Sequence, residues 1–160
     1  MRDGKPCSPR IVEEFQFEDG IEEAVAILRG CGFPVIILTN QPDIARRTMT
    51  LNAMLEMANR ICTELSVSAV YICPHDDQDF CICRKPKPGM FHEAARLFRI
   101  DCSRSFIIGD SWKDMDAGRE AGSKTFLLDR PYNRGTSCDY LVKNMKNAVE
   151  LILKLNGKQK

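Results

Sequence analysis

The sequence predicts an α/β fold in which a Rossmann-like parallel sheet is flanked by helices. Apolar runs of strand length alternate with amphipathic segments of helical period, which is typical of parallel sheets with right-handed crossovers. The run at 33–38 is continuously apolar, as expected for a strand buried on both faces. The chain has 160 residues, 44% of them hydrophobic, and we expect a single domain spanning 1–160.

The expected elements follow an irregular segment at 1–17, and the first helix starts at Asp19 or Gly20 and ends at Gly30. The second helix starts at Thr48 or Thr50 and runs to residue 65. Its apolar positions recur every three or four residues: Leu51, Met54, Leu55, Ala58, Ile61, Cys62 and Leu65. Strands are predicted at 33–38, 67–72, 105–108, 124–128 and 140–142, and further helices at 89–98, 113–121 and 147–155.

Charge and hydropathy exclude several classes of function. The net charge is +1 with 28% charged residues, so the basic excess of a nonspecific nucleic-acid binder is missing. No apolar run approaches the roughly 20 residues that span a bilayer, and no apolar stretch follows the first residues as in a signal peptide. We therefore expect a cytoplasmic protein with neither a membrane nor a nucleic-acid partner.

Polar residues follow the predicted strand at 33–38. Ligands of parallel α/β sheets bind at the carboxyl ends of the strands, which directs attention to Thr39, Asn40 and Gln41. Their hydroxyl and amide groups are neutral donors for phosphate oxygens. A turn with a capping threonine is the structural alternative.

Two further strand ends carry charge. Arg84, Lys85 and Lys87 lie within four residues and suit an anion site, although a solvated basic loop has the same composition. Asp110 follows a buried strand and suits Mg²⁺, although either it or Ser111 would also cap the next helix. Together the three strand ends predict a phosphate site, because phosphoryl transfer depends mainly on positioning and charge neutralisation.

A cysteine–histidine cluster predicts a structural metal site. Cys73, His75, Cys81 and Cys83 supply three thiolates and an imidazole, the ligand set of a closed tetrahedral zinc site inserted at 73–83. Such a site would pin the basic run that follows it. His92 is expected on a helix surface. The remaining cysteines are expected to be ordinary buried or half-buried thiols: Cys31, Cys62, Cys102 and Cys138.

These motifs together resemble a known family. They lie in order at 38–41, 73–75, 83–90 and 109–111. The sequence resembles the haloacid dehalogenase superfamily from about residue 10 to 130. Within it, the zinc cluster and the Cys-Arg-Lys-Pro run resemble the branch of D-glycero-D-manno-heptose 1,7-bisphosphate phosphatases and histidinol phosphatases.

The resemblance implies roles for individual residues. Thr39 and Lys85 would stabilise the transferring phosphoryl group, Asp110 would bind Mg²⁺, and Arg84 would hold the other polar end of the substrate. Ser111 would also bind substrate, and it stands where heptose bisphosphatases often have a basic residue. The implied protein is a monomeric phosphoric monoester hydrolase with Mg²⁺ and structural Zn²⁺, acting on a small phosphorylated metabolite.

The beginning of the chain departs from the family pattern. The family's first strand ends in Asp-x-Asp-Gly and carries the nucleophile, whereas this sequence starts Met1-Arg2-Asp3-Gly4. Either Met1 takes the nucleophile's place, or Asp3 belongs to a later loop, which the spacing favours. Both alignments predict a missing first strand, two unpaired strand edges and an inactive chain.

Three hypotheses compete. The first is a phosphatase, with heptose bisphosphate of surface-polysaccharide synthesis as the preferred substrate and histidinol phosphate next. The second is a non-catalytic phosphate- or zinc-binding derivative of the family. The third, a zinc-ribbon interaction module, leaves the phosphate constellation unexplained.

Overall fold

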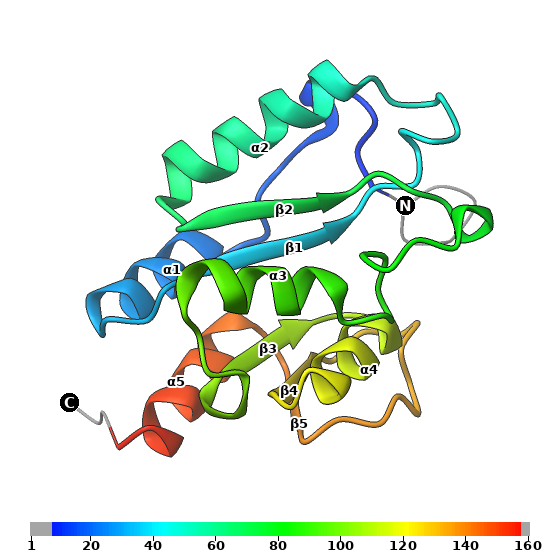
Figure 1. Cartoon of the computed structure of the whole chain (residues 1–160). Coiled ribbons are helices and arrows are strands. Elements are labelled where there is room, and N and C mark those ends of the chain that lie inside the picture. The colour runs from blue at the N-terminus through cyan, green and yellow to red at the C-terminus, as the bar shows by residue number, and fades with distance from the viewer. Residues whose placement is uncertain (1–7, 158–160) are drawn as a thin grey trace.

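The structure of the chain is a computed structural model, and it describes residues 8–157. Strands and helices alternate along the chain, which confirms the predicted α/β class (Figure 1). The strands are β1 (Ile36–Asn40), β2 (Ala69–Cys73), β3 (Phe106–Gly109), β4 (Lys124–Leu128) and β5 (Tyr140–Val142). The helices are α1 (Ile21–Gly30), α2 (Leu51–Leu65), α3 (Gly89–Phe98), α4 (Trp112–Glu120) and α5 (Met145–Leu155), with short 3-10 turns η1 (Val12–Glu14), η2 (Asp77–Asp79) and η3 (Cys102–Arg104).

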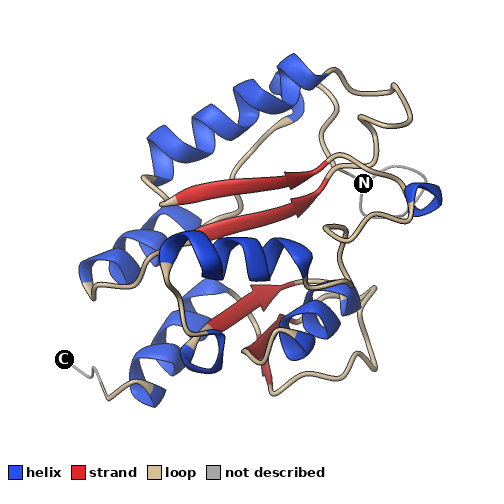
Figure 2. Cartoon of the chain, viewed as in Figure 1, coloured by secondary structure: helices blue, strands red, loops and turns tan. Residues whose placement is uncertain are grey.

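The strands form two parallel sheets, one of β1 and β2 and one of β3, β4 and β5 (Figure 2). Within residues 8–157 no strand lies between β1 and β3, as the missing first strand predicts. β1 starts at Ile36 and not at residue 33, because the N–H of Phe33 donates to Leu28 O at the end of α1 and not to β2.

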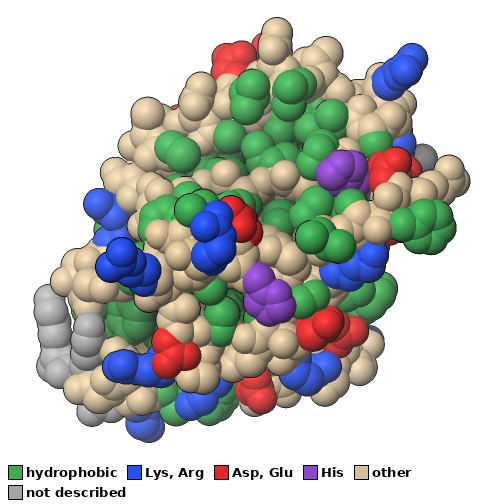
Figure 3. All heavy atoms as spheres, viewed as in Figure 1, with side chains coloured by type: hydrophobic (Ala, Val, Ile, Leu, Met, Phe, Trp, Pro, Cys, Tyr) green, Lys and Arg blue, Asp and Glu red, His purple; other side chains and the backbone are tan. Residues whose placement is uncertain are grey.

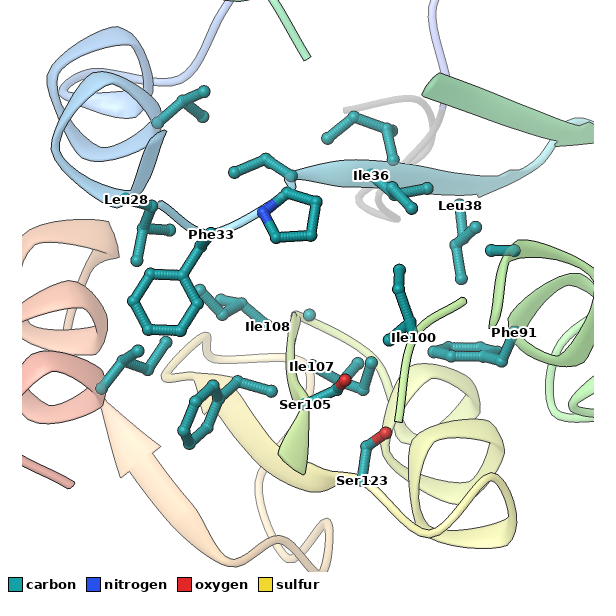
Figure 4. Close-up of a pocket in the computed structure, with 18 of the residues that line it drawn as sticks. Leu28, Phe33, Ile36, Leu38, Phe91, Ile100, Ser105, Ile107, Ile108 and Ser123 are labelled. Atoms are coloured by element: carbon teal, nitrogen blue, oxygen red, sulfur yellow. The ribbon is translucent and has the colours of Figure 1, made fainter. Parts of the chain in front are cut away.

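A cleft of about 1030 Å³ separates the two sheets. Ile36 and Leu38 of β1, Ile108 of β3 and Phe91 of α3 line it with apolar side chains (Figure 4). The prediction that β1 is buried on both faces is therefore wrong: its residues are only half-buried. The cleft exposes one edge of the strand to solvent, which a continuous sheet would have covered.

Hydrogen-bond parity shows which backbone groups face the cleft. Val35 O accepts from Ser68 N, and Gln41 N donates to Cys73 O. The backbone N–H and C=O groups of the odd-numbered residues in this segment therefore point toward β2. Alternate residues of a strand point in opposite directions, and the N–H and C=O groups of Ile36 and Leu38 therefore face the cleft.

Buried side chains form separate clusters on the two sheets. Phe126 of β4 and Val149 of α5 belong to the cluster that packs α1 and α5 on the larger sheet. Met57 and Ile61 of α2 belong to clusters beside β1 and β2. The predicted periodic positions of α2 include the buried Ile61 but not the buried Met57, and some of them are exposed.

Some of the periodic apolar positions of α2 face solvent. Leu51 and Leu55 are 55% and 47% exposed. Cys62 is also exposed, so the prediction that its thiol is buried or half-buried is wrong. The helix buries only the stripe that meets the small sheet, and two strands are too narrow to cover a wider face. Apolar side chains accordingly appear on the molecular surface (Figure 3). None of the helices in the described part of the chain combines the length and apolar character needed to cross a bilayer.

Candidate phosphate site and zinc site

Lys85 joins the predicted loops at the carboxyl edge of the sheets. Its Nζ donates to Leu38 O of β1 at 2.6 Å and to Asp114 Oδ1 of α4 at 2.6 Å. Only about an eighth of each charged side chain is exposed, at 12% for Lys85 and 13% for Asp114. One ammonium group thus connects strand β1 with the first turn of α4, the helix that follows β3, so the two strand ends converge across the cleft.

Asn40 holds the backbone of Lys85. Its Oδ1 accepts from Lys85 N at 3.1 Å, and its Nδ2 donates to Lys85 O at 3.0 Å. This pair of bonds fixes the loop and engages both ends of the Asn40 amide. The predicted substrate contact of Asn40 stays a prediction, and its observed contacts are structural.

Thr39 and Gln41 are coupled to each other. Gln41 Nε2 donates to Thr39 Oγ1 at 3.0 Å, which leaves the hydroxyl proton of Thr39 for a further acceptor. Gln41 is 8% exposed, and its Oε1 is buried with no hydrogen-bond partner among residues 8–157. A buried acceptor of this kind is costly, and a donor from a ligand or a water would satisfy it.

Asp114 is the site residue that the sequence analysis missed. Ser111 N and Oγ both donate to Asp114 Oδ2, at 3.1 and 2.7 Å, and Ser111 Oγ accepts from Asp114 N. Ser111 is thus the N-cap of α4, the structural alternative considered above. A Cβ on Gly109 would lie 2.4 Å from Asp114 Cβ, so glycine permits this close approach. The spacing of four residues between Asp110 and Asp114 was the feature of the sequence that could have identified Asp114 as a site residue.

Asp110 offers a carboxylate at the end of β3. Its Oδ2 accepts from the hydroxyl of Tyr132, and within residues 8–157 its Oδ1 has no hydrogen bond. A carboxylate oxygen at a strand end suits Mg²⁺, which takes oxygen ligands and retains waters. Burial, followed by the bond to Asp110, raises the pKa of Tyr132 to about 12, so its phenol is a neutral donor at pH 7.

The four predicted zinc ligands come together. Their ligand atoms all lie within 4.8 Å of one another. Cys73 Sγ is 3.7 Å from Cys81 Sγ and 3.2 Å from Cys83 Sγ, and His75 Nδ1 is 3.3 Å from Cys83 Sγ. Tetrahedral zinc with Zn–S bonds of about 2.3 Å places sulfur atoms about 3.8 Å apart, so the donor set fits a closed zinc site.

Protonation of the cluster depends on a bound metal. Burial, with hydrogen bonding from Cys83 next, raises the pKa of Cys73 to about 12. Burial likewise raises the pKa of Cys83. A metal ion must therefore displace thiol protons when it binds.

The zinc loop, residues 73–83, and the basic run, residues 84–87, are joined by hydrogen bonds. Arg84 Nε donates to Asp77 Oδ1 at 2.7 Å, and Arg84 Nη1 donates to His75 O at 3.1 Å. Lys87 Nζ donates to Cys81 O at 2.7 Å. Arg84 is 9% exposed and bonded within the loop, so its predicted contact with substrate stays a prediction. His92 is exposed, as predicted.

Residues 9–122 match the haloacid dehalogenase-like hydrolases. The chain belongs to this family, which confirms the family that the motifs indicated. The alignments of Met1 and Asp3 concern positions outside the described residues.

Several relatives share one name. The chain is 35% identical over 122 residues to the D-glycero-beta-D-manno-heptose-1,7-bisphosphate 7-phosphatase of Bordetella bronchiseptica, covering 73% of this chain and 68% of that protein. It is 32% identical over 147 residues to the Helicobacter pylori enzyme of that name, covering 88% and 84%. The match spans about two thirds of the length of the Bordetella and Neisseria meningitidis relatives.

A solved structure agrees with the sequence relatives. The D,D-heptose 1.7-bisphosphate phosphatase of B. bronchiseptica, complexed with magnesium and phosphate, superposes with a TM-score of 0.84 at 26% identity. The superposition covers 91% of this chain and 88% of that one.

Proposed function

We propose that this chain is the phosphate-handling domain of a magnesium-dependent phosphatase whose substrate is a small sugar phosphate. D-glycero-D-manno-heptose 1,7-bisphosphate is the preferred candidate, because relatives that cover most of the chain carry that name. The observation that carries the proposal is that Lys85 bonds both to Leu38, which precedes Thr39 in β1, and to Asp114, four residues after Asp110.

The proposed roles follow from charge. Lys85 would stabilise the negative charge on the transferring phosphoryl group, and the Thr39 hydroxyl would donate to one of its oxygens. Asp114 keeps the Lys85 ammonium in place. Mg²⁺ held by Asp110 would supply further charge neutralisation for the phosphate.

The attacking group is not assigned within residues 8–157. Asp114 is engaged by Lys85 and Ser111, and Asp110 is assigned to Mg²⁺, so neither carboxylate is proposed as the nucleophile. The proposal therefore concerns binding and charge stabilisation by the described residues.

The zinc cluster has a structural role in this proposal. Three thiolates and an imidazole fill a tetrahedral site and leave no open position for substrate. The apolar clusters lie on the two sheets and outside the zinc loop, which argues against a module that folds around zinc alone.

The test is phosphate release from a panel of sugar phosphates and histidinol phosphate, with and without Mg²⁺, by the complete gene product. Lys85→Met should lower kcat about 100-fold or more, because it removes a donor to the transition state. Lys154→Met, on the exposed end of α5, is the matched control and should change nothing. Phosphate binding without release would favour the non-catalytic derivative. The absence of both phosphate binding and phosphate release would refute the proposal.

A further inference from the structure

A turn between β4 and β5 holds Asp110 at two points. The hydroxyl of Tyr132 donates to Asp110 Oδ2. The neighbouring Asn133 donates from Nδ2 to Asp110 O and to Leu128 O, each at 2.8 Å. Two consecutive residues therefore hold both the carboxylate and the backbone carbonyl of the candidate magnesium ligand.

The turn is itself fixed. Asn133 is 6% exposed, and its Oδ1 accepts from Arg130 N at 3.1 Å. Asn133 O accepts from Thr136 N at 3.1 Å. The guanidinium of Arg130 pairs with Glu18, on the segment that precedes α1. The position of the Tyr132 hydroxyl is therefore set by buried and long-range contacts, although the residue is 45% exposed.

We propose that Tyr132 is a positioning residue that orients Asp110 toward Mg²⁺. A carboxylate has two oxygens, and the hydroxyl of Tyr132 engages Oδ2 while Oδ1 faces no described hydrogen-bond donor. A ligating carboxylate that is held by a second hydrogen bond presents its free oxygen in one orientation, and loss of such a bond typically weakens metal binding 10- to 100-fold.

The opposite role has the opposite sign. A hydroxyl that competed with the cation for Asp110 would lower metal affinity, and its removal would tighten binding. The bond from Asn133 to Asp110 O argues for positioning, because it fixes the backbone of Asp110 without engaging the carboxylate. The inference rests on the proposed magnesium site and adds the residue that sets its affinity.

The test compares Tyr132→Phe with Tyr140→Phe by calorimetric titration of the 160-residue chain with MgCl₂. Tyr140 stacks on Phe126 in the large cluster, a contact that phenylalanine retains, so this variant is the matched control. We expect Tyr132→Phe to bind Mg²⁺ about 10-fold more weakly than wild type, and Tyr140→Phe to match wild type. The zinc content per chain should be equal in all three proteins and reports that each is folded around the cluster.

Two results would overturn the inference, and they have different consequences for the magnesium site and the proposed function. Unchanged or tighter Mg²⁺ binding by Tyr132→Phe refutes the role of Tyr132 and leaves the magnesium site intact. A wild-type chain that binds no Mg²⁺ refutes the magnesium site, and with it both the positioning role and the magnesium dependence of the proposed function.

Discussion

The Lys85–Asp114 ion pair should be a major contributor to stability as well as to the proposed site. The two side chains are 12% and 13% exposed, and their charged atoms are 2.6 Å apart. Lys85 also donates to Leu38 O, and Asp114 also accepts from Ser111. Removing one charge leaves the other largely desolvated with incomplete compensation.

The expected cost follows from that burial. Breaking a buried pair by removing one partner costs about 3–5 kcal/mol, and a hydrogen bond to a charged group is worth about 1.5–3 kcal/mol. Asp114 keeps its bonds to Ser111 when Lys85 is lost, so we expect Lys85→Met to lower the free energy of unfolding by about 2–4 kcal/mol. Asp114→Asn should cost a similar amount.

The assay is urea unfolding of both single variants and of the double variant. The double variant should be more stable than the sum of the single costs implies, by about 1 kcal/mol or more, because the second substitution removes a charge that is already unpaired. Glu64→Gln breaks the exposed Arg60–Glu64 pair of α2 and serves as the control, with no measurable change expected. Additive costs, or single costs no larger than the control, would refute the reasoning.

Three further predictions concern the zinc site, an ion pair and a glycine. Cys81→Ser should lower the zinc content, and wild-type zinc affinity measured by competition with a chelator should rise from pH 6 to pH 8, because the raised pKa of Cys73 makes protons compete with the metal. Asp43→Asn should lower the free energy of unfolding by about 1.5–3 kcal/mol at pH 7, measured by urea unfolding. The hydrogen bond from Arg10 holds the pKa of Asp43 below its ordinary 3.8; its stabilisation is therefore present above that value, and the gap between wild type and variant should narrow as pH falls through the folded pKa. Gly109→Ala should cost about 1–3 kcal/mol in the same assay, because its Cβ would meet Asp114 at 2.4 Å, whereas Gly122→Ala has open space but a positive φ, so any cost there reports backbone strain alone.

The order of elements could be predicted from local pattern. Helix α2 begins after Thr50, whose Oγ1 accepts from Ala53 N, as its capping position and apolar spacing indicate. The strands β4 and β5 have the predicted bounds. Exposure was harder to predict, since the periodicity that located α2 gave no sign that Leu51 and Leu55 would face solvent. Which apolar stripe is buried depends on the width of the sheet beneath the helix.

The predicted zinc ligands and the polar site segments could be located from the sequence, because the ligands of the cluster lie within eleven residues and the basic run follows them directly. The polar residues at 39–41 and 110–111 each follow a strand. Only the tertiary structure decided how the side chains are used. It directs the Asn40 amide to the Lys85 backbone, pairs Lys85 with Asp114, and brings Tyr132 to Asp110. These partners are 22 to 45 residues apart in the sequence. They meet because parallel strands deliver their carboxyl ends to one edge, where distant loops approach closely enough to bond.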